Sequence, residues 1–407
     1  MTPSILIAMA VIIGWSLLAG RLERWRIPGP LLMVIAGIAI GFSTRNEIGN
    51  TLNTVIAERA VELILALLLF VDATEVKGGY FGGERAITAR LLCVALPLSL
   101  ILATVLGVLL LPDLSVAVVL IVACVVVPTD FSPASSILRD KRLPARVRHV
   151  INVESGYNDG IVAPVFVFAL TLAGDHEHAA TPIEALESAF PAAAFAILAG
   201  AAVGLISAWL TNSAVRHRLT TAQSLRIGIV MIPLLAYGCS VIVGGNGFVA
   251  AFISGIAYRA ARNQQELGDE QLGLLDEVGI LAGLVMWFVF GSTSVLLLSL
   301  GVEWSIVLYV LLALTLVRIV PVFIALTGSN LSRSDRLLVG AIGPRGTASI
   351  VFGLLAFNAL DDDFAGETLY AMTLTIIGSL VIHGVGSSLI AQRMASDTRP
   401  ATGKSVR

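Results

Sequence analysis

Long apolar runs constrain this chain more than any other feature of its sequence. A membrane-spanning helix needs about 17 to 25 mostly apolar residues, and runs of that kind follow one another through the chain. Only 13% of the residues are charged, against roughly 25% in soluble domains. The sequence therefore predicts an all-α polytopic membrane protein with thirteen transmembrane helices. The predicted spans are 4–20, 29–43, 54–73, 87–111, 115–138, 147–173, 186–211, 221–243, 247–260, 276–298, 303–327, 336–358 and 366–391.

Basic residues divide the connecting loops into two alternating sets. The loops after every odd-numbered span, with the C-terminal tail, carry most of the 26 Lys and Arg residues. The other loops hold Arg45 and Arg59 and acidic stretches at 175–178 and 361–363. Since short basic loops stay in the cytoplasm, we expect a cytoplasmic-membrane protein with its N-terminus outside and its C-terminus inside. The net charge of −2 argues against a nucleic-acid partner.

Two of the predicted spans are interrupted. Pro128 and Pro133 lack an amide hydrogen and disfavour helix at the residue before them. Far down the chain, Gly343 and Pro344 stand side by side. Non-helical backbone survives at membrane depth only where it lines a cavity or is buried in protein. One interrupted span in each half indicates inverted repeats, here spans 1–6 and 8–13, with a binding site at their interface.

Acidic residues accompany the first interruption. An Asp at the centre of a spanning helix costs about 2.5–3.5 kcal/mol, so Asp130 and Asp159 are candidate functional groups. Asn158 and Asp159 follow Ser155 by three and four residues, so all three can share one helix face. With Asp130 and Thr129 they supply hard oxygen ligands, which suit a small monovalent cation such as Na⁺. A cation and a proton would compete for the same carboxylate, and access from both sides then gives antiport.

Other charges in the apolar spans receive different predictions. Glu154 points partly away from the Asp159 face, so we expect a structural ion pair between Glu154 and Arg345. Arg318 lies near a basic loop and is expected to extend toward the membrane surface. Asp72 either borders the ion path or lies at the water interface. Glu75 and His149, both near basic loops, receive no role.

Four motifs together resemble one family. The chain carries PTD at 128–130, ESGYNDG at 154–160, an acid at Asp72 and GPRGTASIVFGLLA at 343–356. In this order and at membrane depth they resemble the NhaP-type sodium/proton antiporters of the monovalent cation:proton antiporter superfamily. The resemblance implies that Asp130 and Asp159 bind the ions, with Thr129, Ser155 and Asn158 as supporting ligands and Asp72 near the site. It also implies a Glu154–Arg345 pair.

The resemblance further implies a homodimer that works by elevator-like motion of a core domain. Asn158 matches the electroneutral members, while Phe131 departs from the usual proline after the TD pair. The implied units are a dimerisation domain (1–75 and 221–300), a core domain (86–173 and 301–391), a linker helix (174–220) and a cytoplasmic tail (392–407).

The sequence thus predicts a secondary transporter that exchanges Na⁺ or Li⁺ for H⁺, one for one, across the lipid bilayer. We expect no organic cofactor and no enzymatic activity. K⁺/H⁺ exchange is the close alternative, because oxygen ligands alone do not fix the size of the cation. An intramembrane aspartyl protease built on Asp130 and Asp159 is a distant alternative.

Overall fold

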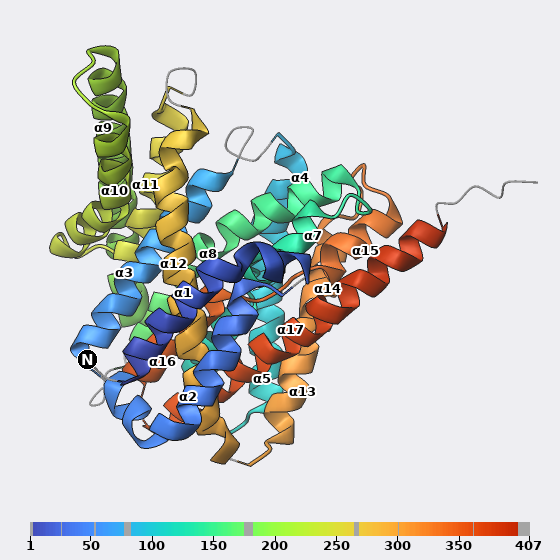
Figure 1. The fold of residues 1–407 in the computed structure, drawn as a ribbon. Coiled ribbons are helices and arrows are strands. Elements are labelled where there is room, and N and C mark those ends of the chain that lie inside the picture. Colours follow the sequence, from blue (N-terminus) through green and yellow to red (C-terminus); the bar gives the residue numbers. More distant parts are fainter. Residues whose placement is uncertain are drawn as a thin grey trace, which may run out of the picture.

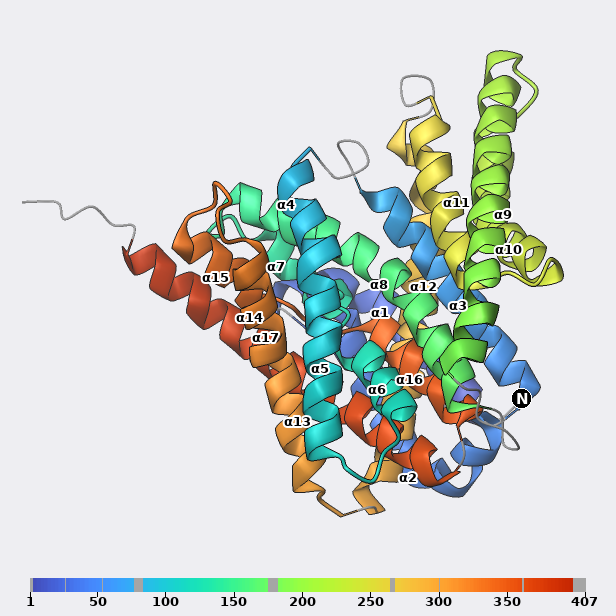
Figure 2. The same cartoon turned by 180° about the vertical axis from the view of Figure 1, so that it is seen from behind.

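Every element in the described part of the chain is a helix (Figures 1 and 2). The computed structural model describes residues 3–25, 27–52, 54–76, 83–174, 182–263, 268–299, 301–360 and 362–397. The acidic stretch at 175–178, residue 361 and the end of the tail from residue 398 lie outside these ranges. The prediction of an all-α chain is confirmed.

The helices of the first half run from α1 to α8 and are followed by the long helix α9. Their bounds are α1 Pro3–Arg24, α2 Gly29–Leu52, α3 Val55–Glu75, α4 Arg85–Arg90, η1 Leu91–Ala95, α5 Leu96–Leu110, α6 Val116–Val126, η2 Ser132–Ala134, α7 Ser135–Arg139, α8 Ala145–Ala173 and α9 Pro182–Arg216.

The second half continues with α10 to α17. Its bounds are α10 Ala222–Ile242, α11 Gly247–Ala261, η3 Asp269–Leu272, α12 Gly273–Ser294, η4 Val295–Ser299, α13 Trp304–Leu314, α14 Leu316–Ala325, α15 Arg333–Ala341, α16 Thr347–Ala359 and α17 Asp362–Asp397.

Each of the thirteen predicted spans coincides with one helix or with a run of consecutive helices. Within the described ranges, 8 helical runs are long and apolar enough to cross a membrane. Shorter apolar helices complete the set, among them Val116–Val126 and Thr347–Ala359. These two are short because each is one half of an interrupted span.

The two interruptions have local causes in the sequence. Helix α6 ends at Val126. Val127 still has helical backbone, and Pro128, which has no amide hydrogen, cannot continue the hydrogen bonds of the helix. Helix α15 ends at Ala341, shortly before Pro344, and α16 begins only after Gly346. In the first span the longer half precedes the break, and in the second it follows the break.

Close backbone contacts join the helices outside the interrupted spans. A Cβ atom on Gly291 of α12 would collide with the carbonyl of Val34 on α2, and one on Gly37 would collide with Phe288. Gly200 on α9 approaches the backbone of Ala250 on α11 in the same way. Small residues thus allow α2 to pack directly on α12, and α9 on α11.

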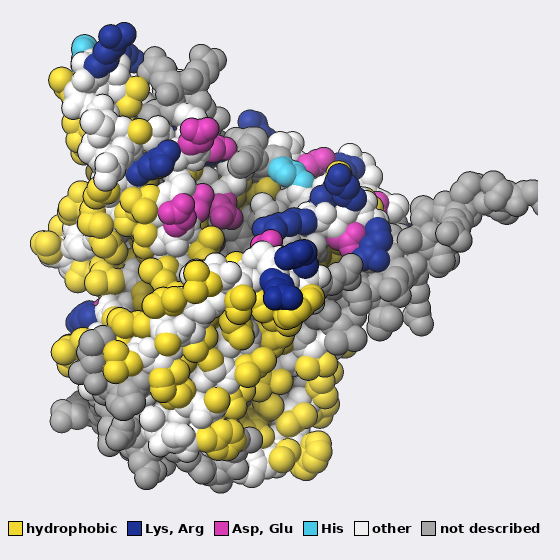
Figure 3. Space-filling model, viewed as in Figure 1, with side chains coloured by type: hydrophobic (Ala, Val, Ile, Leu, Met, Phe, Trp, Pro, Cys, Tyr) yellow, Lys and Arg dark blue, Asp and Glu magenta, His cyan; other side chains and the backbone are white. Residues whose placement is uncertain are grey.

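Charged side chains gather at one end of the molecule, while hydrophobic side chains cover most of the face below (Figure 3). We call this end the basic end. It is formed by the start of α4 and by the connections α7–α8 and α14–α15. Arg139, Arg142 and Arg146 lie there, and Arg146 pairs with Glu84 at 2.7 Å between Nε and Oε1. An apolar band with a charged end fits a protein embedded in a bilayer.

Candidate ion-binding site

The two interrupted spans meet at their breaks. The backbone amide of Asp130 donates to the carbonyl of Pro344 at 2.8 Å. In return, the amide of Thr347 donates to Oδ2 of the Asp130 carboxylate at 2.6 Å. A Cβ atom on Gly346 would collide with this carboxylate, so a glycine is needed there. Each break therefore donates a backbone hydrogen bond to the other, and these two bonds fix the crossing.

The Asp130 carboxylate is occupied by hydrogen-bond donors. Its Oδ1 accepts the amide of Ser132 at 2.7 Å, and its Oδ2 accepts the Ser132 hydroxyl at 2.8 Å as well as the Thr347 amide. Thr347 is the first residue of α16, so the carboxylate also lies at the positive end of the helix dipole. These hydrogen bonds give Asp130 an anchoring role at the crossing.

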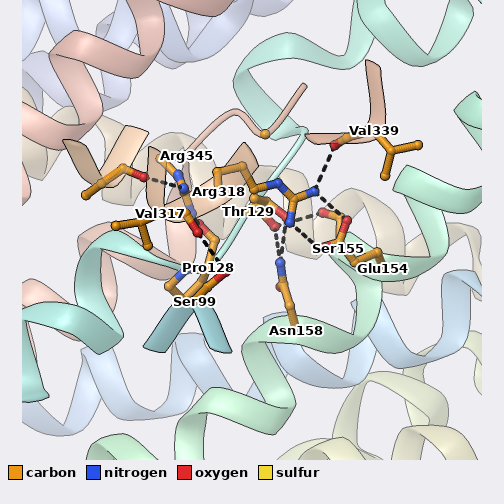
Figure 4. Close-up of polar contacts among 12 residues, drawn as sticks. Ser99, Pro128, Thr129, Glu154, Ser155, Asn158, Val317, Arg318, Val339 and Arg345 are labelled. Carbon is orange, nitrogen blue, oxygen red and sulfur yellow. Dashed lines mark hydrogen bonds and ion pairs between the residues drawn. The ribbon is translucent and has the colours of Figure 1, made fainter. Parts of the chain in front are cut away.

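Side chains of α8 satisfy the backbone of the first break. The amide nitrogen Nδ2 of Asn158 donates to the carbonyl of Thr129 at 3.0 Å and lies 2.6 Å from the Thr129 hydroxyl (Figure 4). Ser155 Oγ donates to the same carbonyl at 2.9 Å (Figure 4). The predicted grouping of Thr129, Ser155 and Asn158 is therefore present in the structure.

Asp159 differs from Asp130 in its surroundings. Its side chain is buried, and its Oδ1 has no hydrogen-bond partner in the described part of the chain. The same holds for Oδ1 of the neighbouring Asn158, whose nitrogen is engaged with Thr129. A buried oxygen without a partner costs free energy unless a proton or a cation occupies it. Among the described contacts, Asp159 thus lacks the donors that hold Asp130.

A cavity of about 1190 Å³ connects Asp159 with the basic end. Asp72, Asp130, Ser155 and Thr347 line its inner part, together with Asp159. Its wall continues past exposed Arg139 in the α7–α8 connection. Water and ions therefore have a route from the basic end to the crossing.

Asp72 lies on the cavity wall and not at the outer rim of α3. Its carbonyl would be 3.1 Å from a Cβ atom on Gly156, which places α3 directly against α8 one turn before Asp159. The charges of Asp159 and Asp130 act on the Asp72 carboxylate. Asp72 thus lines the same cavity as Asp130 and Asp159. Glu75, one turn further along α3, is exposed near the mouth of the same cavity.

The buried ion pair is not the predicted one. Both carboxylate oxygens of Glu154 accept from the guanidinium of Arg318, with Nη2 and Oε2 2.6 Å apart (Figure 4). The predicted Glu154–Arg345 pair is therefore wrong, and so is the expectation that Arg318 extends to the membrane surface. The cause is a helix break at Thr315, where φ is −118° and ψ is −82°, which separates α13 from α14 and turns Arg318 inward.

Arg345 instead binds backbone at the crossing. Its Nη1 donates to the carbonyl of Pro128 at 2.8 Å, so it ties the second break to the first (Figure 4). Its side chain is buried, and the charges of Glu154 and Asp159 act on it from nearby. Arg345 thus balances the buried acids without forming a direct salt bridge to Glu154 among the contacts of the described residues.

Four polar residues that hold the crossing were not among the predicted site residues. Ser132 and Thr347 bind Asp130, and Ser379 and His383 on α17 bind the second break. The last two are four residues apart in an apolar span, which is the spacing that singled out Ser155 and Asp159. That signal was available in the sequence.

The polar groups at the crossing suit a hard cation that is bound weakly. Its polar groups are carboxylate, hydroxyl, amide and carbonyl oxygens, with no thiolate or imidazole among the predicted ligands. No cluster of three or more His, Cys, Asp or Glu side chains suited to a resident metal occurs within the described ranges.

Two interrupted helices that cross at acidic residues, reached by a cavity from one end of a helical bundle, define a secondary transporter. The sodium/hydrogen exchanger transmembrane family model matches residues 7–393. The chain therefore belongs to the sodium/hydrogen exchanger family.

Several known proteins are similar to this chain over most of its length. The fold resembles that of the sodium proton antiporter MjNhaP1 of Methanocaldococcus jannaschii, with a TM-score of 0.75 at 20% identity over 95% of this chain and 98% of that one. A Na⁺/H⁺ antiporter of Schizosaccharomyces pombe is 24% identical over 79% of this chain and 74% of its own length. The Na⁺/H⁺ antiporter NhaH of Halobacillus dabanensis is 24% identical over 67% of this chain and 68% of its own. These relatives are transporters, as expected from the sequence.

Proposed function

We propose that this protein exchanges one Na⁺ or Li⁺ for one H⁺ across the cytoplasmic membrane. The observation that carries the proposal is the contrast between the two aspartates. Asp130 is held by three hydrogen bonds, whereas Asp159 has an unpartnered buried oxygen facing the same crossing. Asp159 then alternates between a proton and a cation, and the protein changes its exposed side only when Asp159 is occupied.

The ligands of the cation follow from the same geometry. Asp159 supplies the charge, and the unpartnered Oδ1 of Asn158 and the cavity-lining hydroxyl of Ser155 supply neutral oxygens. Thr129 supports the site by holding Ser155 and Asn158 through its carbonyl, while Asp130 and Asp72 add negative potential. Neither an organic cofactor nor a nucleotide has a part in this exchange.

Asn158, the residue before Asp159, determines how much net charge each transport cycle carries across the membrane. Asn158 is neutral and donates its amide hydrogens to Thr129, so it carries no proton through the cycle. One carboxylate then exchanges one proton for one monovalent cation. Such exchange is insensitive to a membrane potential that is worth about 2.3 kcal/mol per charge per 100 mV.

The arrangement of the helices supports a moving core domain. Both breaks and nearly all the site residues belong to 86–173 and 301–391, whereas Asp72 belongs to the other unit, 1–75 with 221–300. The cation site then lies on the boundary between the units, and sliding one past the other exposes Asp159 to either side. The second unit serves as the dimer interface in a homodimer, with the basic end in the cytoplasm.

Purified protein in liposomes tests the proposal. Proton movement is followed with a pH-sensitive dye after pulses of Na⁺, Li⁺ or K⁺, first at zero potential and then at an imposed potential. Responses to Na⁺ and Li⁺ that do not change with voltage support it. Voltage-dependent rates contradict the one-for-one exchange, and a response to K⁺ alone establishes K⁺/H⁺ exchange instead.

A further inference from the structure

Helix α17 holds the second break through two side chains. The backbone amide of Arg345 donates to Ser379 Oγ at 2.7 Å, and that of Gly343 donates to His383 Nε2 at 3.2 Å. Ser379 and His383 are both buried and, being four residues apart, lie on one face of α17. Residues in a break have no helical partners for their amides, so these two acceptors replace them.

The first break is held in an equivalent way. There, Ser155 and Asn158 on α8 donate to the Thr129 carbonyl. Helices α8 and α17 coincide with the sixth and the thirteenth predicted spans, which end the two repeats. Each break is thus anchored by a serine and a second polar residue one turn later, on the last helix of its own repeat. His383 corresponds in this arrangement to Asn158.

The contact fixes the protonation state of His383. Nε2 accepts the Gly343 amide only if it carries no proton, so the imidazole is neutral and its hydrogen is on Nδ1. Nδ1 lies 3.1 Å from the carbonyl and 3.3 Å from the hydroxyl of Ser379, which accept that hydrogen. A second proton on Nε2 would turn the acceptor into a donor and release the Gly343 amide. The Ala341 carbonyl, also beside the ring, is then the available acceptor.

Protons can reach His383 through the cavity. The side chain is one of the groups that line the cavity, as are Asp130 and Asp159. The charges that act on the ring are the two buried cations Arg345 and Arg318. Helices α6, α13 and α16 and the short helix η2, which pack on α17, contain no Asp, Glu, Lys, Arg or His. Helix α12 contributes Asp276 and Glu277 only in its first turns, at the basic end.

We propose that His383 is a positioning residue of this exchanger, which holds the second break only while the imidazole is neutral. Acidification of the compartment that the cavity faces protonates Nε2, frees the Gly343 amide and slows transport. The inference rests on the proposed function, because it assigns His383 a place in the pH dependence of that exchange. It adds no ligand to the cation.

Three variants in liposomes separate the contributions of His383 and Ser379. Glutamine at 383 can accept the Gly343 amide through Oε1 but does not titrate. His383→Gln therefore transports near the wild-type rate at pH 7, and in acid it keeps only the part of the decline that proton competition at Asp159 causes. His383→Ala leaves the amide unsatisfied and lowers the rate about tenfold at pH 7. The difference from the wild type shrinks in acid, where the wild type also loses this contact. Ser379→Ala lowers the transport rate, but the rate still declines at acidic pH (the acidic limb of the pH profile) as it does in the wild type.

A spectroscopic measurement tests the contact without transport. The ¹³C and ¹⁵N shifts of the imidazole distinguish the Nδ1–H tautomer from the Nε2–H tautomer, and the His383→Gln spectrum identifies the His383 signals. The inference requires the Nδ1–H form at pH 7 and its loss at acidic pH together with the transport rate. An Nε2–H tautomer, or an acidic limb unchanged in His383→Gln, would overturn it. If the wild type exchanges no cation for protons, the proposed function fails, and the tautomer still decides whether the Gly343 contact exists.

Discussion

The side-chain amide nitrogen of Asn158 lies 2.6 Å from the hydroxyl of Thr129 and 3.0 Å from its carbonyl oxygen. This contact makes Asn158 a donor that the first break requires. Replacing it by an acid does not simply add a second proton carrier. An ionised carboxylate at this position cannot donate to either oxygen, so the carbonyl of Thr129 keeps only Ser155.

For Asn158→Asp we therefore predict a lower unfolding free energy, by about 1–3 kcal/mol, and slower transport that stays insensitive to voltage. Thermal unfolding in detergent and the liposome assay at two potentials measure both effects. Asn158→Gln, which retains the donor on a longer chain, is the matched comparison. A fully active, voltage-driven Asn158→Asp protein would show that the Thr129 contact is dispensable.

The buried salt bridge predicts a strong coupling between Glu154 and Arg318. Removing one partner leaves a buried charge unpaired, which typically costs about 3–5 kcal/mol. We expect Glu154→Gln and Arg318→Gln each to destabilise the protein, and the double variant to be more stable than the sum of the two effects implies. Unfolding free energies of the four proteins give the coupling energy.

The same double-mutant cycle with Arg345 in place of Arg318 provides the comparison. Arg345 contacts the carbonyl of Pro128 and has no direct bond to Glu154 among the contacts of the described residues. The coupling between Glu154 and Arg345 should therefore be smaller than that between Glu154 and Arg318. The reverse order would restore the pairing expected from the sequence.

The close approach of Gly346 to Asp130 predicts that the crossing tolerates no side chain there. A Cβ atom would overlap the Asp130 carboxylate, so Gly346→Ala has to displace either the carboxylate or the start of α16. We expect a lower unfolding midpoint and little transport. In Gly366→Ala, by contrast, the new methyl group has nothing within 4 Å, and the protein should behave like the wild type. Equal behaviour of the two variants would contradict the tight crossing.

The ion pair at the basic end predicts a pH-dependent contribution to stability. Hydrogen bonds from Arg146 hold the pKa of Glu84 below its ordinary value. A carboxyl whose pKa falls on folding stabilises the protein above the pKa of the unfolded state, and this stabilisation is lost as pH falls through the folded pKa. The pair is about one-third exposed, so its contribution is about 0–1 kcal/mol.

Glu84→Gln should therefore lower the unfolding midpoint slightly at pH 7 and converge with the wild type in acid. Added salt should shrink the difference at pH 7, because exposed charges are screened. A difference that persists unchanged in acid and at high salt would mean that the ion pair is not its cause.

Local rules predicted the helices and the breaks well. Pro128 and the Gly343–Pro344 pair favour a break locally, although Pro164 and Pro233 lie inside the continuous helices α8 and α10. Asp159 is buried and Asp130 half-buried, in keeping with their depth in apolar spans. The grouping of Ser155 and Asn158 follows from helical spacing. These features depend on residues close together in the chain, so the sequence alone was sufficient.

The pairing of charges across the fold was harder to predict. Arg318 and Arg345 are both buried cations in the second half, and distance along a helix does not say which one faces Glu154. Which arginine faces Glu154 depends on the helix break at Thr315, and no proline or glycine lies at that position to indicate it. The different roles of Asp130 and Asp159 also come from distant partners, since Thr347 binds one carboxylate and not the other.

Sodium binding to purified protein tests the central claim, that Na⁺ and H⁺ compete for Asp159. Titration calorimetry in two buffers with different ionisation enthalpies gives the number of protons released per Na⁺ bound. The account predicts a release close to one proton in the wild type, a release of similar size but weaker binding in Asp130→Asn, and neither binding nor release in Asp159→Asn. Sodium binding by Asp159→Asn with wild-type proton release would contradict it.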